Sequence, residues 1–436
     1  MEGTKVGWGR RRCMLGCAAV LLVALSATAC NGAASGPQQK ASGSYAMPLA
    51  SSSNSVETPR PSRAQTLSPT IAPTPAPTFG PPGKFVPTGS MTVGRDASTA
   101  TLLLDGRVLI AGGDSSDGYR SAELYDPKTG TFSKTGSMTV GRNYATATLL
   151  LDGRVLILGG WEYPNKNGQV ESASAELYDP KTGTFSPTGS MAAAHFSPDA
   201  TRLVDGRVLI TGGDSANSAE LYDPTTGTFS PAGNGTDALG STATLLLDGR
   251  VLILRGDFPG FLYDPATGTF SKTGSMDTVN QDYVATRISD GRVLVVGAAL
   301  RGGITYPATE LYDPATGTFS PTGSMINECM CSISQSTVTA PLLADGRVLV
   351  PDGIFDVVRG TAIGSAELYD PVTGTFSQAG PMSRFRKSFT DTLLADGRVL
   401  FAGDEGAVFA PGVPSLSPAG IKANDADRAS AELYVP

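Results

Sequence analysis

The chain has 436 residues, with 33 Lys and Arg against 40 Asp and Glu, and a formal net charge of −7. Beyond residue 12 it contains no basic tract or stripe, so neither nucleic acid nor an anionic membrane surface is expected as a partner. Gly (53) and Pro (31) are frequent, which fits many turns, and no helical periodicity of useful length follows residue 30.

Residues 1–29 predict an export signal. Basic residues up to Arg12 precede an apolar run from Met14 to Leu25, which is too short for a comfortable membrane span. Ala27-Thr28-Ala29-Cys30 resembles a bacterial lipobox, with Ala27 in place of the usual Leu. The resemblance implies that Cys30 is lipidated and anchors the exported protein to the outer side of the cell membrane. An ordinary signal peptide and a retained membrane anchor are the alternatives, and the Arg run also permits twin-arginine export.

Residues 30–83 predict a disordered tether. They are rich in Ser, Pro and Thr and contain few large apolar residues, so no core could offset the entropy of ordering. At ~3.1 Å per residue, a fully extended tether would reach ~150 Å. We expect it to hold the following domain clear of the membrane.

Segment 97–138 predicts a meander of four strands. ASTATLLL and RVLIAGG are apolar runs, and Asp105-Gly106 between them favours a two-residue hairpin turn. AELYDP predicts the third strand, with Leu124 buried and Glu123 and Tyr125 on the other side of the pleat. An Asp-Pro-x-Thr-Gly turn then leads into the fourth strand. Four strands this short cannot bury both faces, so the unit needs neighbours.

The same unit recurs along the chain at intervals of roughly 40–55 residues, near the ~50 residues of kelch repeats. Its Asp-Gly-Arg turns begin at Asp105, Asp152, Asp205, Asp248, Asp290, Asp345 and Asp396. The Gly-Gly doublet, the Glu-Leu-Tyr-Asp-Pro strand and the aromatic residue after Thr-Gly-Thr also recur. Together these features resemble kelch repeats over about residues 84–436, with Phe in place of the family's usual Trp. The resemblance implies an all-β propeller.

The two ends of the repeat region predict how that propeller is completed. The last copy stops at residues 433–436 without a fourth strand, whereas Lys84–Met91 matches the fourth strand of Thr184–Met191. We therefore predict a single closed seven-bladed kelch-type β-propeller over residues 84–436, whose last blade is completed by the N-terminal strand. Closure would hide strand edges that otherwise invite aggregation.

Strand direction alternates within a blade, so the connections fall on two faces. The Asp-Gly and Asp-Pro turns share one, which we call the short-turn face. The loops after Gly-Gly and after Gly-Ser-Met share the other, the long-loop face, and they vary widely in length. Variable loops on a rigid scaffold usually carry function. We therefore expect a protein or carbohydrate of the cell envelope to bind the long-loop face.

Alignment on the Asp-Gly turn brings out two polar positions of this face. Ten residues before the turn stand Arg95, Arg142, His195, Ala238, Asn280, Gln335 and Arg386. Nine residues after it stand Asp114, Trp161, Asp214, Asp257, Ala299, Ile354 and Glu405. The two positions are diagonal neighbours in a hairpin, within reach of a long side chain. The expected pairs are Arg95 with Asp114, His195 with Asp214, Arg386 with Glu405 and, through a cation–π contact, Arg142 with Trp161.

These pairs have two interpretations. Either they finish the rim of the channel within each blade, or they form a polar ring that holds an anionic or hydroxyl-rich ligand. Aromatic and Arg side chains carry much of the energy of interfaces, although each aromatic could instead pack between blades. The predicted binding face consists of Arg95, Arg142, Tyr144, Trp161, Tyr163, His195, Asp214, Phe355, Phe385, Arg386 and Glu405.

The cysteines of the repeat region are Cys329 and Cys331. Because the protein is predicted to be exported, a Cys-x-Cys disulfide or two inert thiols is expected. A Cu(I) site with Met330 between them is an alternative, and so is Ca²⁺ bound by loop acids, although no Asp-x-Asp-x-Asp loop supports it. We predict no bound metal and no cofactor.

The kelch fold also occurs in galactose oxidase and similar copper-radical enzymes, whose metal site requires two histidines and two tyrosines. This chain has one histidine, His195, so that site cannot be assembled. A Ser-His-Asp arrangement would have to use His195 with Asp199 or Asp214, and no Gly-x-Ser-x-Gly motif supports it. We expect a monomeric, non-catalytic binding or scaffold module. The alternatives are an enzyme that acts on a polysaccharide with loop carboxylates, and a purely structural spacer.

Overall fold

The computed structural model describes residues 80–113, 119–165, 168–213, 218–233, 242–256, 259–277, 281–301, 304–326, 339–356, 361–384, 386, 388–403 and 428–436. All described residues belong to one compact unit, Pro73–Pro436. The predicted signal, most of the predicted tether and Cys30 lie outside the described residues. Within the described ranges no helix is long and apolar enough to cross a membrane.

The repeat at 97–138 forms a four-stranded antiparallel sheet, as predicted. It consists of β2 (Thr99–Leu102), β3 (Val108–Ala111), β4 (Ala122–Asp126) and β5 (Thr131–Lys134), paired in that order. Gly106 in the first turn has a φ of 87°, a conformation that residues with a Cβ rarely adopt. Its N–H donates to the carbonyl of Leu103 at 3.0 Å, which closes the turn.

The same strand order recurs in the following repeats. Further four-stranded sheets are β7 (Thr146–Leu149), β8 (Val155–Leu158), β11 (Ala175–Asp179) and β12 (Thr184–Pro187); β13 (Asp199–Arg202), β14 (Val208–Thr211), β15 (Ala219–Asp223) and β16 (Thr228–Pro231); β17 (Thr242–Leu245), β18 (Val251–Leu254), β19 (Pro259–Asp264) and β20 (Thr269–Ser275); and β21 (Gln281–Arg287), β22 (Val293–Arg301), β23 (Ile304–Asp313) and β24 (Thr318–Pro321).

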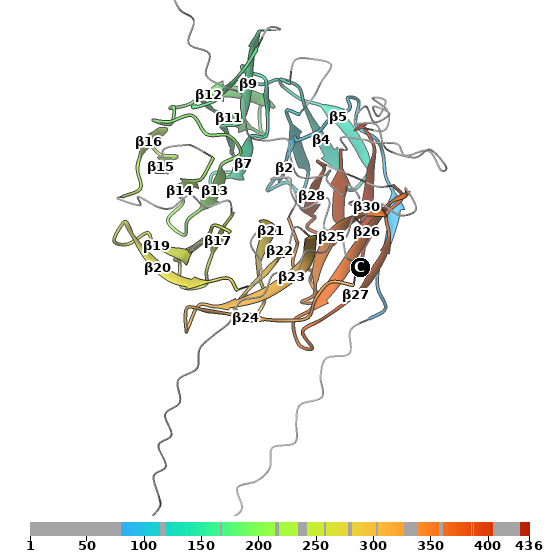
Figure 1. Cartoon of the computed structure of the whole chain (residues 1–436). Helices are drawn as coiled ribbons and strands as arrows, with labels where there is room; N and C mark the ends of the chain where they lie inside the picture. The colour runs from blue at the N-terminus through green and yellow to red at the C-terminus, as the bar shows by residue number, and fades with distance from the viewer. Residues whose placement is uncertain are drawn as a thin grey trace, which may run out of the picture. The chain divides into compact units, whose positions relative to one another are not determined.

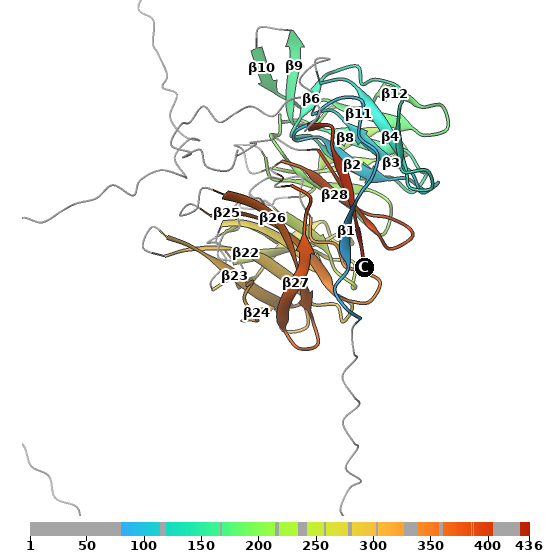
Figure 2. The same cartoon turned by 90° about the vertical axis from the view of Figure 1, so that its right-hand side faces the viewer.

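Two sheets have three strands in the described part of the chain. One is β25 (Val348–Asp356), β26 (Thr361–Asp370) and β27 (Thr375–Pro381). The other combines β6 (Arg142–Asn143) with the hairpin of β9 (Trp161–Asn165) and β10 (Gly168–Glu171). Figure 2 shows that this hairpin stands out from the remaining sheets.

The two ends of the repeat region pair with each other. β1 (Lys84–Pro87) is the outer strand of a sheet that continues with β30 (Ala431–Val435), β29 (Val399–Ala402) and β28 (Thr390–Leu393). In this antiparallel pair Phe85 lies opposite Tyr434. The missing fourth strand of the last repeat is therefore supplied by the N-terminal segment, as the sequence predicts.

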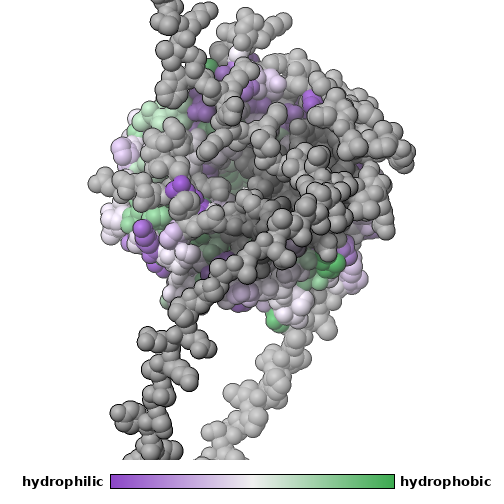
Figure 3. All heavy atoms as spheres, in the orientation of Figure 1, coloured by the Kyte–Doolittle hydropathy of each residue, from purple (hydrophilic) through white to green (hydrophobic). Residues whose placement is uncertain are grey.

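Figure 1 shows the sheets following one another around a common centre, with their first strands nearest to it. Among these first strands, β2 contacts β28 and β7, β13 contacts β7 and β17, and β17 contacts β21. Side chains also link the sheets. The Thr148 hydroxyl, for example, donates to the Ala200 carbonyl at 2.9 Å. On the side turned to the viewer in Figure 3, apolar residues form small separate groups among the coloured atoms.

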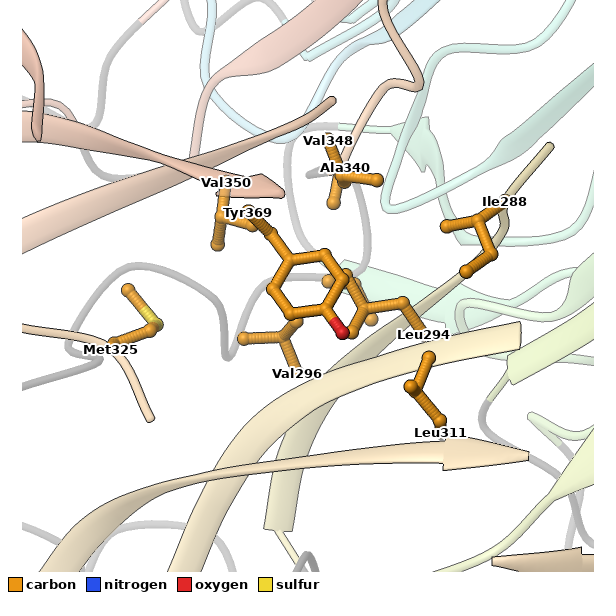
Figure 4. Close-up of a cluster of buried hydrophobic side chains, with 10 residues drawn as sticks. Ile288, Leu294, Val296, Leu311, Met325, Ala340, Val348, Val350 and Tyr369 are labelled. Carbon is orange, nitrogen blue, oxygen red and sulfur yellow. The ribbon is translucent and has the colours of Figure 1, made fainter. Parts of the chain in front are cut away.

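The core lies between neighbouring sheets. In Figure 4, Tyr369 of β26 lies among Leu294 and Val296 of β22 and Leu311 of β23. The third strand of each repeat is therefore covered on both sides. In β4, Glu123 and Tyr125 are fully buried, and Leu124 between them is 7% exposed.

A threonine–tyrosine hydrogen bond joins most neighbouring sheets. The Thr88 hydroxyl, just after β1, lies 2.8 Å from the Tyr125 hydroxyl of β4, and Thr135 repeats the contact with Tyr178 at 2.8 Å. The buried Tyr263 hydroxyl has no hydrogen-bond partner among the described residues, because Ala232 stands at the threonine position.

Candidate functional site

Three arginines and one histidine that were predicted for the long-loop face are buried. Arg95, Arg142, His195 and Arg386 have relative exposures of 0%, 1%, 0% and 1%. Each stands on the connection that leads from one sheet into the first strand of the next. Since a buried charge is costly unless it is paired, the partners of these side chains decide what they do.

Arg95 is held entirely by the β3–β4 hairpin. Its Nη1 donates to the carbonyl oxygens of Gly112 at 2.8 Å and Ser121 at 3.0 Å. Its Nη2 donates to the Ser121 hydroxyl at 2.9 Å and to Oε1 of Glu123 at 3.1 Å. The ion pair is buried on both sides.

Arg142, His195 and Arg386 repeat these contacts. Each bonds the carbonyl oxygen of the residue that follows the second strand: Arg142 bonds Gly159 at 3.2 Å, His195 Gly212 at 2.6 Å and Arg386 Gly403 at 2.9 Å. Each also pairs with the glutamate of the third strand: Arg142 with Glu176 at 3.3 Å, His195 with Glu220 at 3.5 Å and Arg386 with Glu432 at 2.8 Å. We call each such set the cation–Glu clamp.

The glutamate of the clamp also binds the backbone of the arriving connection. Oε2 of Glu123 accepts the N–H of Thr92 at 2.7 Å, and Oε2 of Glu176 accepts that of Thr139 at 2.7 Å. In a repeat that has it, the clamp thus ties three parts together: the arriving connection, the hairpin and the third strand. Burial lowers the pKa of Arg142, although Glu176 and Glu162 act in the opposite direction.

The described acidic partners of these side chains are glutamates of the third strands. The predicted acids Asp114, Asp214 and Glu405 lie outside the described residues, whereas the acid found beside each cation is the glutamate of the Glu-Leu-Tyr strand. A signal for this pairing is present in the sequence. In the fourth repeat the aligned positions hold Ala238 and Phe261, so both charges are absent there, whereas the fifth and sixth repeats keep the glutamates Glu310 and Glu367 without a cation at the aligned position.

His195 takes the place of arginine in its clamp. Its Nδ1 lies 2.6 Å from the Gly212 carbonyl oxygen, so this nitrogen carries a proton. Burial acts to raise the pKa of Glu220, but hydrogen bonds from His195 and from two backbone amides bring it below its usual value. Asp199, considered as an alternative partner of His195, instead accepts the amide of Ala243 at 2.7 Å.

Three of the predicted aromatic residues belong to a set of ring contacts that joins three sheets. Rings of Tyr119 and Tyr163 are stacked with centroids 3.9 Å apart and planes at 12°. The ring of Phe196 lies 5.3 Å from Tyr144 and 5.2 Å from Trp161. All five side chains are half-buried. Each lies in a connection between the second and third strands of a repeat or in a connection that leads into the first strand. These connections form the long-loop face. We call the five side chains the aromatic group.

The sequence predicts Tyr144, Trp161 and Tyr163 but not their partners Tyr119 and Phe196. The indole of Trp161 packs on Phe196, while the guanidinium of Arg142 is taken up by its clamp. The other two predicted aromatics are not described: Phe385 lies outside the described residues, and the backbone of Phe355 belongs to β25 without a described side chain.

Tyr163 keeps its phenolic proton at neutral pH. Burial and the neighbouring Tyr119 raise its pKa to about 12. Its hydroxyl donates to Oε1 of Gln169 at 3.3 Å, across the β9–β10 hairpin. The aromatic group therefore presents a neutral apolar surface with hydroxyl groups at its edge.

The described residues do not fit a copper-radical site. The chain's one histidine is buried in a clamp, with its Nδ1 bound to a backbone carbonyl. In the described part of the chain, no group of three or more His, Cys, Asp or Glu could hold a metal ion. Cys329 and Cys331 lie outside the described residues.

Comparison with known proteins supports the repeat assignment. Residues 97–139 match the family model of the Kelch motif. No curated protein matches the chain. Among solved structures, a fungal alcohol oxidase of the AA5 family in complex with copper matches with a TM-score of 0.61 and 17% sequence identity. The match covers 81% of this chain and 76% of the oxidase, and at this identity it shows a shared fold only.

Proposed function

We propose that this kelch-repeat protein is a binding module of the cell envelope, which recognises a protein or glycan through the aromatic group on its long-loop face. In this proposal the repeats form a closed ring of seven blades, Cys30 carries a lipid, and the tether sets the distance from the membrane. The ring provides a rigid scaffold, and the protein binds its partner without catalysing a reaction.

The observation that carries the proposal is the aromatic group. Five aromatic rings gather from three successive sheets, and they remain half-buried instead of being covered by neighbouring strands. Aromatic side chains bring a large apolar area at low entropic cost, and Tyr hydroxyls add hydrogen bonds. Such a surface suits either the apolar face of a sugar ring or an apolar side chain of a protein partner.

Contacts between the first and last repeats support the closed ring. Nη2 of Arg398, in the last Asp-Gly-Arg turn, donates to the Pro127 carbonyl of the first repeat at 2.8 Å. The same type of contact joins successive repeats elsewhere, as between Arg154 and Pro224 at 3.3 Å. Inner strands β2 and β28 are also in contact.

Catalysis is the competing hypothesis, but no described feature favours it. The oxidase likeness is one of fold, and the histidine that a copper site would need is buried in a clamp. An enzyme that uses loop carboxylates would have to draw on residues such as Asp214 and Glu405, which lie outside the described residues. Turnover of envelope polysaccharide, lost when one of these acids is changed to its amide, would favour the enzyme.

The proposal is tested with the full chain and a variant in which Tyr144, Trp161 and Tyr163 are changed to Ala. Both proteins are crosslinked in their own envelope, and the captured molecules are identified by mass spectrometry; binding to immobilised envelope glycans is measured in parallel. We expect at least about tenfold weaker capture by the variant, because hot-spot aromatics carry about 2 kcal/mol or more each.

Tyr306→Ala is the matched control, since Tyr306 is an exposed tyrosine (46%) outside the aromatic group. It should bind like the parent chain. Equal capture by the parent and the triple variant, with both folded, would contradict the proposal. The anchor is tested separately: Cys30→Ala should move the protein from the membrane fraction to the soluble fraction.

A further inference from the structure

Two tyrosines of the aromatic group form a face-to-face pair. The rings of Tyr119 and Tyr163 lie with their centroids 3.9 Å apart and their planes at 12°. Tyr119 stands in the connection between β3 and β4 of the first repeat, whereas Tyr163 belongs to β9, in the hairpin that stands out from the sheets (Figure 2). Each of the other ring contacts between described side chains includes a phenylalanine. This pair therefore combines two phenols in a way that no other described contact does.

The main chain holds both tyrosines in place. The carbonyl oxygen of Tyr119 accepts the N–H of Arg142 at 2.9 Å, and the N–H of Tyr163 donates to the carbonyl oxygen of Gly141 at 3.1 Å. Both residues are thus anchored to one connection, whose Arg142 side chain is fixed in its clamp. Tyr119 also has a φ of 65°, a conformation that bulky residues rarely adopt and that is concentrated at functional sites. The stack is therefore fixed by the backbone of two repeats.

The two phenol groups lie at the same end of the stack. The side chains of Tyr119 and Asn143 are hydrogen-bonded to that of Tyr163, and the Tyr163 hydroxyl donates to Oε1 of Gln169 at 3.3 Å. Because the hydroxyl groups meet and the planes are nearly parallel, the ring carbons beside the hydroxyls, the ortho carbons, also face each other across the stack.

We propose that Tyr119 and Tyr163 are a site of oxidative crosslinking, at which hydrogen peroxide and a peroxidase convert the stacked pair into dityrosine. The peroxidase takes one electron and one proton from each phenol, which leaves two phenoxyl radicals, and hydrogen peroxide is reduced to two molecules of water. A carbon–carbon bond then forms between one ortho carbon of each ring. The ortho C–H bonds break, and their hydrogens return to the two phenolic oxygens.

The geometry favours coupling within the pair over coupling between molecules. Both rings are half-buried, so their exposed edges are open to an external oxidant, while the backbone anchors keep the two radicals together. A held pair reacts in a unimolecular step, at an effective concentration far above that of a protein in solution. The new bond would join the first repeat to the hairpin of the second and restrict the unfolded chain, as a disulfide does. The proposal does not depend on what the aromatic group binds.

The other described tyrosines have different surroundings. The tyrosines of the third strands, such as Tyr125 and Tyr178, are fully buried and pack on a phenylalanine. Tyr144 is half-buried beside Phe196, and Tyr306 is 46% exposed. Tyr144 and Tyr306 are therefore phenols open to solvent that are not stacked on a described tyrosine, which makes them suitable controls.

The test treats the full chain with hydrogen peroxide and a peroxidase and analyses a tryptic digest by mass spectrometry. Trypsin releases residues 108–120 and 155–166 as two peptides, and each contains one tyrosine. We expect these peptides to be linked, with a mass two hydrogen atoms below their sum, and the monomer to show dityrosine fluorescence. The yield should not change on about tenfold dilution of the protein, because the reaction is unimolecular.

Tyr119→Phe and Tyr163→Phe keep an aromatic ring in the stack but remove one phenol. Each should lower the dityrosine fluorescence of the monomer at least about tenfold, whereas Tyr144→Phe and Tyr306→Phe should give the parent yield. Equal fluorescence of the parent and Tyr163→Phe, a yield that falls on dilution, or dityrosine mainly between two copies would overturn the proposal. So would oxidation confined to Met and Trp without the linked peptides.

Discussion

The sheets β2–β5 and β17–β20 have the same strand order but differ in the cation–Glu clamp. In the first sheet Arg95 and Glu123 form a buried ion pair. In the second, Phe261 stands at the glutamate position and packs against the core, while Ala238, at the cation position, lies outside the described residues. The same sheet therefore forms around an ion pair or around an apolar residue.

This comparison shows that a sheet can form without the clamp, so the clamp is more important for attaching the sheet to the connection that precedes it. A buried ion pair adds little net stability over a well-packed apolar pair, because removing both charges from water is costly. The clamp does supply something that Phe261 cannot: the carboxylate of Glu123 accepts the Thr92 amide of the arriving connection. We infer that the clamp's main contribution is to fix where each connection enters its sheet.

Breaking the clamp on one side should give the largest loss of stability. Arg95→Ala leaves Glu123 as a buried charge without its cation, so we expect the free energy of unfolding to fall by about 3–5 kcal/mol. Denaturant unfolding of the full chain, followed by intrinsic fluorescence, measures this loss.

The control for that prediction converts the first sheet to the pattern of the fourth. Arg95→Ala combined with Glu123→Phe removes both charges, and we expect it to recover more than half of the loss. If the double variant is as unstable as the single one, or if Arg95→Ala costs less than about 1 kcal/mol, the clamp does not work as described.

A second prediction concerns Asp391, a buried carboxylate with no cation beside it among the described residues. Its ionisation should lower the stability of the fold. Asp391 of β28 accepts the backbone N–H and the hydroxyl of Thr339, both at 2.6 Å, and burial raises its pKa to about 7. The unfolded value is ~3.9, so the charged form is disfavoured in the fold, and stability falls as pH rises from about 4 to 7. The loss at pH 8 is at most about 4 kcal/mol.

Asp391→Asn reproduces the neutral side chain, because its oxygen can accept the amide and its nitrogen can donate to the hydroxyl. We expect it to raise the free energy of unfolding at pH 8 and to leave it nearly unchanged at pH 4. Asp199→Asn should act in the same direction over a narrower range, since the pKa of Asp199 is raised to about 6. An equal effect of Asp391→Asn at both pH values would exclude this explanation.

The fold could be predicted in detail because its signals are local. The Asp-Gly turn, the apolar runs and the Asp-Pro turn each lie within a few residues, and repetition makes them unmistakable. The pairing of Phe85 with Tyr434 spans the whole domain, yet it was predictable because one repeat lacks a strand that the other end of the chain supplies.

The site was harder to predict because its contacts cross between elements. Arg95 was expected to contact Asp114, its diagonal neighbour in the first hairpin. The described acid beside it is Glu123 of the third strand. Glu123 is buried, although it lies on the opposite side of the strand from Leu124. The stacking of Tyr119 on Tyr163 joins two repeats, and hydrophobic periodicity carries no information on such contacts. Comparison of whole repeats gave only a partial signal, because both charges are replaced in the fourth repeat (Ala238 and Phe261) but Glu310 and Glu367 remain in the two repeats that follow.

The threonine–tyrosine link between sheets predicts a smaller loss. Thr135→Ala leaves the buried Tyr178 hydroxyl without the partner that now lies 2.8 Å away. An unsatisfied buried hydroxyl costs about 1–3 kcal/mol, and denaturant unfolding should show a decrease of that size. Thr129→Ala is the control, because its hydroxyl bonds only within an exposed turn; a similar loss in both variants would argue against the link.

The smallest effect is expected where the link is missing, between β16 and the sheet β17–β20. Ala232 makes the same backbone bond to the preceding sheet as Thr135, from its N–H to the Ala219 carbonyl at 2.9 Å. A threonine here would therefore point its hydroxyl at the unsatisfied Tyr263. We expect Ala232→Thr to raise the free energy of unfolding by about 1 kcal/mol, and Ala232→Val, of similar shape without the hydroxyl, to give no gain. If both variants raise the free energy of unfolding equally, the gain comes from filling space beside Ala232 and not from a hydrogen bond to Tyr263.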